Sequence, residues 1–160
     1  MASRRKAREA LLKALYLSES RRITVREAFS EMEAVDHEIE QTPVEREDLP
    51  LEPFALGIEE GQKEFALALA YRISRKKDTF NEQIKAVLEN WDFSRISRID
   101  RYIMWIALAE MTSMPDIPLN VSFNEAIELA KKFSSGKSSG FVNGILDSVA
   151  QNMGLIKRNN

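Results

Sequence analysis

The first residues of the chain have the chemistry needed to hold a polyanion. Residues 1–22 contain seven basic side chains and two acidic ones, and the basic side chains cluster at Arg4, Arg5, Lys6 and Arg8. Arginine offers a planar fork of donors that matches phosphate oxygens, and lysine adds a compact positive charge. The alternative is an ordinary solvated helix start. A basic first turn opposes the helix dipole, however, so the cluster indicates a functional reason.

Tyr16 is the aromatic residue that could act together with these arginines. On a helix it lies about 20° around the axis from Arg5, with Leu12 one turn before it. An aromatic ring beside arginines can stack an unpaired base while the cations hold the phosphates. The alternative is that Leu12 and Tyr16 pack together against a neighbouring helix. The sequence does not decide between these two interpretations.

A second segment with binding chemistry is Ser134–Phe141, which contains Lys137, Ser138 and two glycines. It precedes the last predicted helix, whose N-terminal amides could receive a phosphate. The glycines, Gly136 and Gly140, would let the backbone approach a ligand closely. An ordinary interhelical loop is the alternative interpretation. The segment is no nucleotide-binding P-loop, because the chain has no GxxxxGK[ST] run.

Residues suited to catalysis or metal binding are few. The chain has no cysteine, which excludes disulfides, thiolate ligands and a cysteine nucleophile. The single histidine, His37, lies among acidic residues and is interpreted as exposed. Among the later carboxylates, Glu125 is expected to form a capping box with Ser122, and Glu128 to pair with Lys132. We therefore expect no catalytic residue, no metal site and no cofactor.

The charge distribution matters more here than the net charge of −2 and the pI of about 5.6. Residues 31–64 hold twelve acids and two basic residues, whereas residues 131–160 hold five basic residues and one acid. Basic ends can bind a polyanion, and the acidic middle would remain free for a basic partner. No apolar run is long enough for a transmembrane helix, and charged residues interrupt the start where a secretory signal would need an apolar stretch. We expect a cytoplasmic protein with no membrane partner and no small-molecule substrate.

The apolar spacing predicts an all-α fold with about seven helices in one domain, 1–160. Apolar residues recur at three-to-four spacing throughout, and no segment alternates as a strand would. Ser3 and Thr24 are predicted N-caps, the latter with Glu27 as its capping-box partner. Residues 40–53, acidic and with three prolines at positions 43, 50 and 53, are predicted to link helical halves of about 1–50 and 51–155. The predicted helices cover about residues 3–19, 24–39, 54–75, 78–90, 94–111, 122–133 and 141–153.

Two blocks near the C-terminus resemble the signature of the NusB family of transcription antitermination factors: Asn124–Phe133 and Phe141–Asp147, read NEAIELAKKF and FVNGILD. The spacing between the two blocks also fits. The opening RRKAREA with Leu15-Tyr16 is similar to the start of that family, and matching pieces follow at residues 99–101, 107–111 and 117–118. The resemblance covers nearly the whole chain and is weakest between about residues 20 and 90.

The resemblance implies a fold of two packed three-helix bundles and a function without catalysis. Family members bind boxA-type single-stranded RNA of nascent ribosomal RNA transcripts together with the ribosomal protein NusE, and then join the RNA polymerase antitermination complex. The implied RNA-binding residues are Arg4, Arg5, Lys6, Arg8, Tyr16, Lys137, Ser138 and Phe141. The implied partner-binding residues are Leu88, Asp100 and Arg101.

The chain departs from the family pattern in the loop before the last helix. The family often has an acid at the position of Lys137 and a lysine at that of Gly140, so charge has moved within the loop. Trp105 and Ala109 replace a common arginine and a common tyrosine. The alternative function that these changes permit is an all-helical protein-interaction module without selective RNA binding. NusB-like domains also occur fused to RNA methyltransferases, but that activity would need a Rossmann-like domain, which this sequence does not contain.

Overall fold

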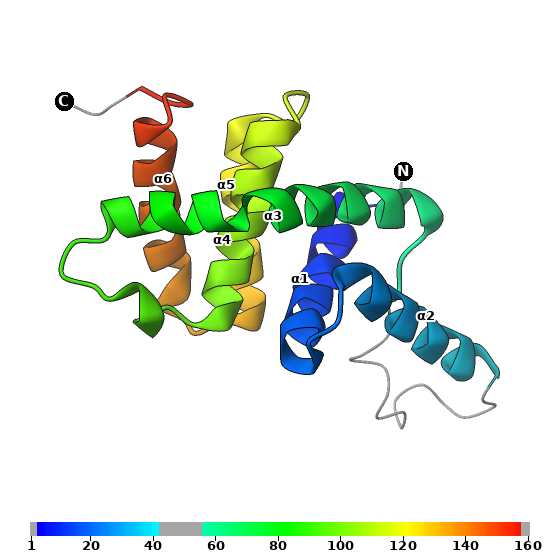
Figure 1. Ribbon diagram of the computed structural model, residues 1–160. Coiled ribbons are helices and arrows are strands. Elements are labelled where there is room, and N and C mark those ends of the chain that lie inside the picture. The colour runs from blue at the N-terminus through cyan, green and yellow to red at the C-terminus, as the bar shows by residue number, and fades with distance from the viewer. Residues whose placement is uncertain (1–2, 42–55, 158–160) are drawn as a thin grey trace. The chain divides into compact units, whose positions relative to one another are not determined.

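The computed structural model describes residues 3–41 and 56–157, and these residues form α-helices and one short 3₁₀ helix, with no strand among them (Figure 1). The predicted all-α class is therefore confirmed. The predicted acidic linker, residues 40–53, lies outside the described residues except at its start. The elements are α1 (Arg4–Arg21), α2 (Val25–Gln41), α3 (Glu60–Val87), η3 (Phe93–Arg95), α4 (Arg98–Ser113), α5 (Leu119–Phe133) and α6 (Ser138–Asn152).

Helix α3 is one continuous helix of 28 residues, where the sequence predicted two helices. The predicted break lay between Arg75 and Asp78, in the charged run Lys76-Lys77. Neither glycine nor proline occurs there, and lysine is a good helix former, so backbone hydrogen bonding continues through the run. The described part of the chain therefore contains six α-helices, and the predicted count of about seven is not confirmed.

The predicted caps of the first two helices are confirmed. The Ser3 hydroxyl accepts a hydrogen bond from the backbone N–H of Arg5 at 3.2 Å. Thr24 and Glu27 form the reciprocal capping box: the Glu27 N–H donates to Thr24 Oγ1 at 3.1 Å, and the Thr24 N–H donates to the Glu27 carboxylate at 3.4 Å. Both caps depend on contacts within three residues, which is why the sequence alone was sufficient to find them.

The predicted capping box at Ser122 is wrong, because α5 already begins at Leu119, directly after Pro118. Ser122 lies inside the helix and is buried, and its hydroxyl donates to the buried carboxylate of Glu110 on α4 at 2.8 Å. A buried carboxylate needs such a partner. Ser122 therefore does not cap a helix, although it matches the Ser-x-x-Glu pattern; it joins α5 to α4.

The chain divides into two compact units, residues 1–70 and 71–160, with the division inside α3. In the first unit α1 packs against α2. Its buried side chains include Leu11, Leu12, Phe29 and Met32, at helical spacing along the two helices. The Asp36 carboxylate of α2 accepts a hydrogen bond from the N–H of Gly57, which fixes the segment leading into α3.

In the second unit α4 is the central helix and packs against both α5 and α6, which also pack against each other (Figure 1). Every residue from Tyr102 to Met111 is buried. A helix that is apolar on nearly all sides is expected at the middle of a bundle. The packing of two three-helix bundles stays a prediction. No helix in residues 3–41 or 56–157 is both long and apolar enough to cross a membrane.

Candidate nucleic-acid interface

The start of α1 presents three of the four predicted cations to solvent. Arg4, Arg5 and Lys6 are exposed, whereas Arg8 is only 4% exposed. The guanidinium carbon of Arg4 lies 4.8 Å, and that of Arg8 5.3 Å, from the centre of the Phe65 ring on α3. An aromatic face attracts such cations. Phe65 therefore holds two of the predicted RNA-binding arginines, through a contact between helices that the spacing of residues along the chain does not reveal.

Tyr16 remains accessible three turns further along α1. Its side chain is 48% exposed, while Leu12, one turn before it, is 1% exposed. Leu12 therefore packs in the interior, as the second interpretation expected, but Tyr16 keeps half of its surface in solvent. An accessible ring on the helix that carries the exposed arginines is compatible with base stacking. Stacking by Tyr16 stays a prediction.

The loop between α5 and α6 is held to α4 by a buried carboxylate. Asp100 is 6% exposed, and its two carboxylate oxygens accept hydrogen bonds from Ser134 Oγ at 2.8 Å and Ser138 Oγ at 3.1 Å. The Ser138 hydroxyl also lies 2.9 Å from the hydroxyl of Ser134 and 2.9 Å from that of Ser135. Asp100 itself belongs to the first turn of α4, where Ser97 Oγ accepts from its N–H at 3.1 Å. This arrangement fixes the loop in one position.

The Asp100 contacts bring one predicted partner-binding residue together with one predicted RNA-binding residue, Ser138. Both side chains are buried and hydrogen-bonded to each other, so they stabilise the loop. Their contact with a ligand stays a prediction. Lys137, by contrast, is exposed on the loop. Lys137 is therefore the loop residue best placed to meet a phosphate.

Phe141 in the first turns of α6 pairs with an aromatic residue that the sequence did not single out. Its ring centre lies 5.4 Å from that of Trp91, at an interplanar angle of 45°. Trp91 is 54% exposed, in the segment between α3 and η3. The one sign in the sequence that Trp91 could matter was its position between two predicted helices, where a large aromatic residue is unusual.

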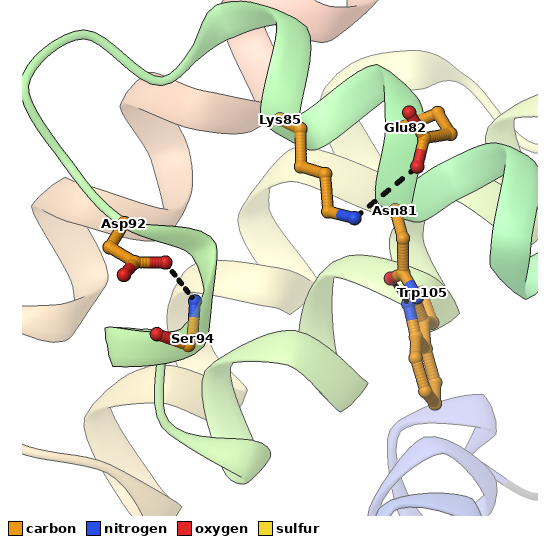
Figure 2. A network of polar contacts seen from close by, with 6 residues as sticks. All are labelled: Asn81, Glu82, Lys85, Asp92, Ser94 and Trp105. Atoms are coloured by element: carbon orange, nitrogen blue, oxygen red, sulfur yellow. Dashed lines mark hydrogen bonds and ion pairs between the residues drawn. The ribbon is translucent and has the colours of Figure 1, made fainter.

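The other predicted partner-binding residues lie at the end of α3 and on α4. Leu88 is half-buried, and the Arg101 guanidinium lies 5.4 Å from the ring of Trp105 and 5.7 Å from that of Tyr102. Trp105 in turn donates from Nε1 to Asn81 Oδ1 at 2.7 Å (Figure 2). Trp105, which departs from the family pattern, therefore has a defined partner on α3. The partner-binding role of Leu88 and Arg101 stays a prediction.

Asp92 caps η3 next to Trp91. Its carboxylate accepts a hydrogen bond from the Ser94 N–H at 2.9 Å (Figure 2), and this hydrogen bond lowers the pKa of Asp92 below its ordinary value. A carboxylate with a depressed pKa keeps its stabilising contact as the pH falls until its folded-state pKa is reached. The cap therefore remains intact at any pH near neutrality.

In the part of the chain that the structure describes, no group of three His, Cys, Asp or Glu side chains could hold a metal ion. His37 is exposed on α2. The exposed side chains with binding chemistry are instead cations and aromatic rings, at the start of α1 in the first unit and around the α5–α6 loop in the second.

The fold and these residues define an all-helical protein with exposed basic and aromatic side chains. The chain belongs to the NusB family, whose sequence model matches residues 5–151. It is 35% identical over 150 residues to the transcription antitermination protein NusB of Myxococcus xanthus, which covers 94% of this chain and 96% of the relative. Two other relatives of that description are 44% and 49% identical over shorter stretches, which span 66% and 52% of their own length.

Solved structures share the fold. NusB of T. maritima superposes with a TM-score of 0.68 and 30% identity, over 93% of this chain and 91% of that structure. A structure of the antitermination factors NusB and NusE in complex with dsRNA superposes with a TM-score of 0.68 and 20% identity, over 93% of this chain and 96% of that chain. The resemblance stated from the sequence motifs is thus confirmed at the level of family and fold.

Proposed function

We propose that this protein is a transcription antitermination factor that binds boxA-type single-stranded RNA of nascent ribosomal RNA transcripts together with NusE, and that the pair joins the RNA polymerase antitermination complex. The observation that carries the proposal is the start of α1, where Arg4, Arg5 and Lys6 are exposed on the helix that also presents Tyr16. Relatives in the same family are named transcription antitermination proteins, and a structural neighbour was solved with NusE and RNA. Such a role needs assembly and no catalysis.

The proposed mechanism divides the work between phosphate contacts and base contacts. The exposed cations of α1 and Lys137 hold the extended backbone of the RNA, which sets affinity and its salt dependence. Aromatic rings such as Tyr16 stack unpaired bases. The acidic stretch, residues 31–64, repels RNA and remains available to a basic protein partner.

The test is a fluorescence-anisotropy titration of a boxA-like single strand and of a scrambled strand, at two salt concentrations, with and without NusE. We expect selective binding that NusE strengthens and that salt weakens. Equal affinity for both strands, even with NusE present, would reject boxA recognition. Binding of NusE without any RNA selectivity would instead identify the alternative, a helical protein-interaction module.

Substituting Gly140 by lysine is expected to strengthen RNA binding at low salt and to steepen the slope of log affinity against log salt by about 0.7, the contribution of one added phosphate contact on a single strand. Gly140 is exposed in the first turn of α6, and a Cβ atom added there meets nothing within 4 Å. Removing a helical glycine should also stabilise the fold by roughly 0.5–1 kcal/mol. Gly140→Gln is the matched control, because it brings the same helix stabilisation without the charge. Equal anisotropy curves for the two variants would place the start of α6 away from the RNA.

A further inference from the structure

Trp91 forms an aromatic pair with the predicted RNA-binding residue Phe141, and neither the sequence motifs nor the proposed phosphate contacts explain why Trp91 is exposed. The two ring centres are 5.4 Å apart, and 54% of the Trp91 side chain faces solvent. A tryptophan is usually largely buried, so the exposure of this indole calls for a physical explanation. Tyr71 on α3 is also exposed and belongs to the same unit as Trp91. Among the described ring contacts, none joins Tyr71 to Phe141, so Tyr71 can serve as a control for Trp91.

The segment that carries Trp91 is fixed on both sides. Asn90 before it adopts the left-handed conformation, with φ of 60°, which turns the chain at the end of α3. Asp92 after it caps η3 through the Ser94 N–H (Figure 2). Lys85 of α3 lies 5.1 Å from the ring of Phe93, the first residue of η3. The indole is therefore presented from a segment with defined conformation, which limits the entropy lost when a ligand stacks on it.

Charge on the neighbouring loop favours an anionic ligand. Residues 129–146 contain Lys131, Lys132 and Lys137 and no acid, and Lys131 pairs with Glu128 just before this range at 3.7 Å. Lys137 is exposed, and its backbone carbonyl accepts a hydrogen bond from the Phe141 N–H at 3.4 Å. Glu89 and Asp92 beside Trp91 are acidic, so a phosphate is expected on the Phe141 and Lys137 side of the pair. A ligand with an aromatic face for the indole and a phosphate for the lysines fits both features.

We propose that Trp91, held beside Phe141, is a base-stacking platform that takes one unpaired base of the bound RNA while Lys137 meets the adjoining backbone. This inference rests on the proposed RNA-binding function and adds a residue to it. Base–aromatic stacking tolerates any base, because every base has a π-face. The platform therefore contributes affinity for single strands and little discrimination between base types.

The experiment uses the intrinsic fluorescence of the full chain, because it has only two tryptophans. Trp105 is 6% exposed and bonded to Asn81, so the variant Trp105→Phe leaves Trp91 as the single reporter. Titrating a boxA-like single strand into this variant with NusE bound is expected to quench the Trp91 emission, and the quenching should follow the anisotropy of labelled RNA. Thermal melting checks that the variant is folded.

Affinity gives the second measurement. Trp91→Ala is expected to lose about tenfold in RNA affinity, within the range measured for removing one stacked base, whereas Trp91→Phe should keep most of it. Tyr71→Ala is the matched control, because it truncates an exposed ring of similar size on the same unit and should leave affinity unchanged.

Three results would overturn the platform. The first is selective RNA binding by the wild-type chain with unchanged Trp91 emission and unchanged affinity of Trp91→Ala, which would leave the proposed function standing. The second is quenching by NusE alone with weaker NusE binding by Trp91→Ala, which would assign the ring to the protein partner. The third is the absence of RNA binding by the wild-type chain, which would remove the proposed function and the platform together.

Discussion

Arg5→Glu is expected to weaken binding of the boxA-like strand by at least about tenfold, because reversing one charge removes a phosphate contact and adds repulsion at the same point. Arg5 is exposed in the first turn of α1, between two other exposed cations, Arg4 and Lys6. Anisotropy titrations across a salt series measure both the affinity and its dependence on salt. The slope of log affinity against log salt should fall in magnitude by about one.

The fold should tolerate this substitution. The Ser3 cap uses the backbone N–H of Arg5 and not its side chain, and an acid in the first turn interacts favourably with the helix dipole. The melting temperature is therefore expected to change little. Arg22→Glu is the matched control, since Arg22 is exposed at the opposite end of the same helix, about 25 Å away by helical rise. Equal losses in the two variants would show a general charge effect with no site at the start of α1.

The elements that the sequence predicted well are those whose ends depend on nearby residues. Ser3 caps α1 and Thr24 caps α2 through contacts no more than three residues long. Several other predicted boundaries were wrong, among them the starts at about residues 94 and 141, where α4 begins at Arg98 and α6 at Ser138. Two of the wrong boundaries show which information was missing. Ser122 matched a cap pattern, yet its hydroxyl serves Glu110 on another helix. The charged run in α3 was read as a break, although nothing in it interrupts helical hydrogen bonding.

The candidate site was predictable in its residue types and less so in its geometry. The pattern of basic residues found the exposed cations of α1, and the loop before α6 was identified by its composition. The contacts that fix the loop are made by Asp100, which lies 34 and 38 positions from Ser134 and Ser138. Trp91 and Phe141 are also far apart in sequence. Contacts of this kind follow from tertiary packing, which local spacing does not encode.

Arg8 shows why members of one basic cluster can differ in role. Exposed Arg5 and buried Arg8 are three residues apart, and the spacing alone gave both the same predicted function. Arg8 is 4% exposed, and its guanidinium lies 5.3 Å from the centre of the Phe65 ring. A buried arginine contributes through the packing of its stem and through its aromatic neighbour as well as through its charge.

Arg8→Ala is accordingly expected to lower the free energy of unfolding by about 2 kcal/mol, because it removes buried packing and the contact with Phe65. RNA affinity, measured where the variant is fully folded, should change much less than in Arg5→Glu. Urea denaturation followed by circular dichroism gives the stability change. In a double-mutant cycle with Phe65→Leu, the two substitutions should be non-additive by about 0.5–1 kcal/mol.

The opposite outcome has an equally definite meaning. If Arg8→Ala unfolds at the wild-type urea concentration but binds RNA at least about tenfold more weakly, then its guanidinium leaves Phe65 in the complex and contacts RNA, as the family resemblance implies. If it is destabilised and binds RNA normally once folded, Arg8 holds Phe65 and α1 together while Arg4, Arg5 and Lys6 meet the phosphates. Burial would then separate the cations that bind RNA from the cation that supports them.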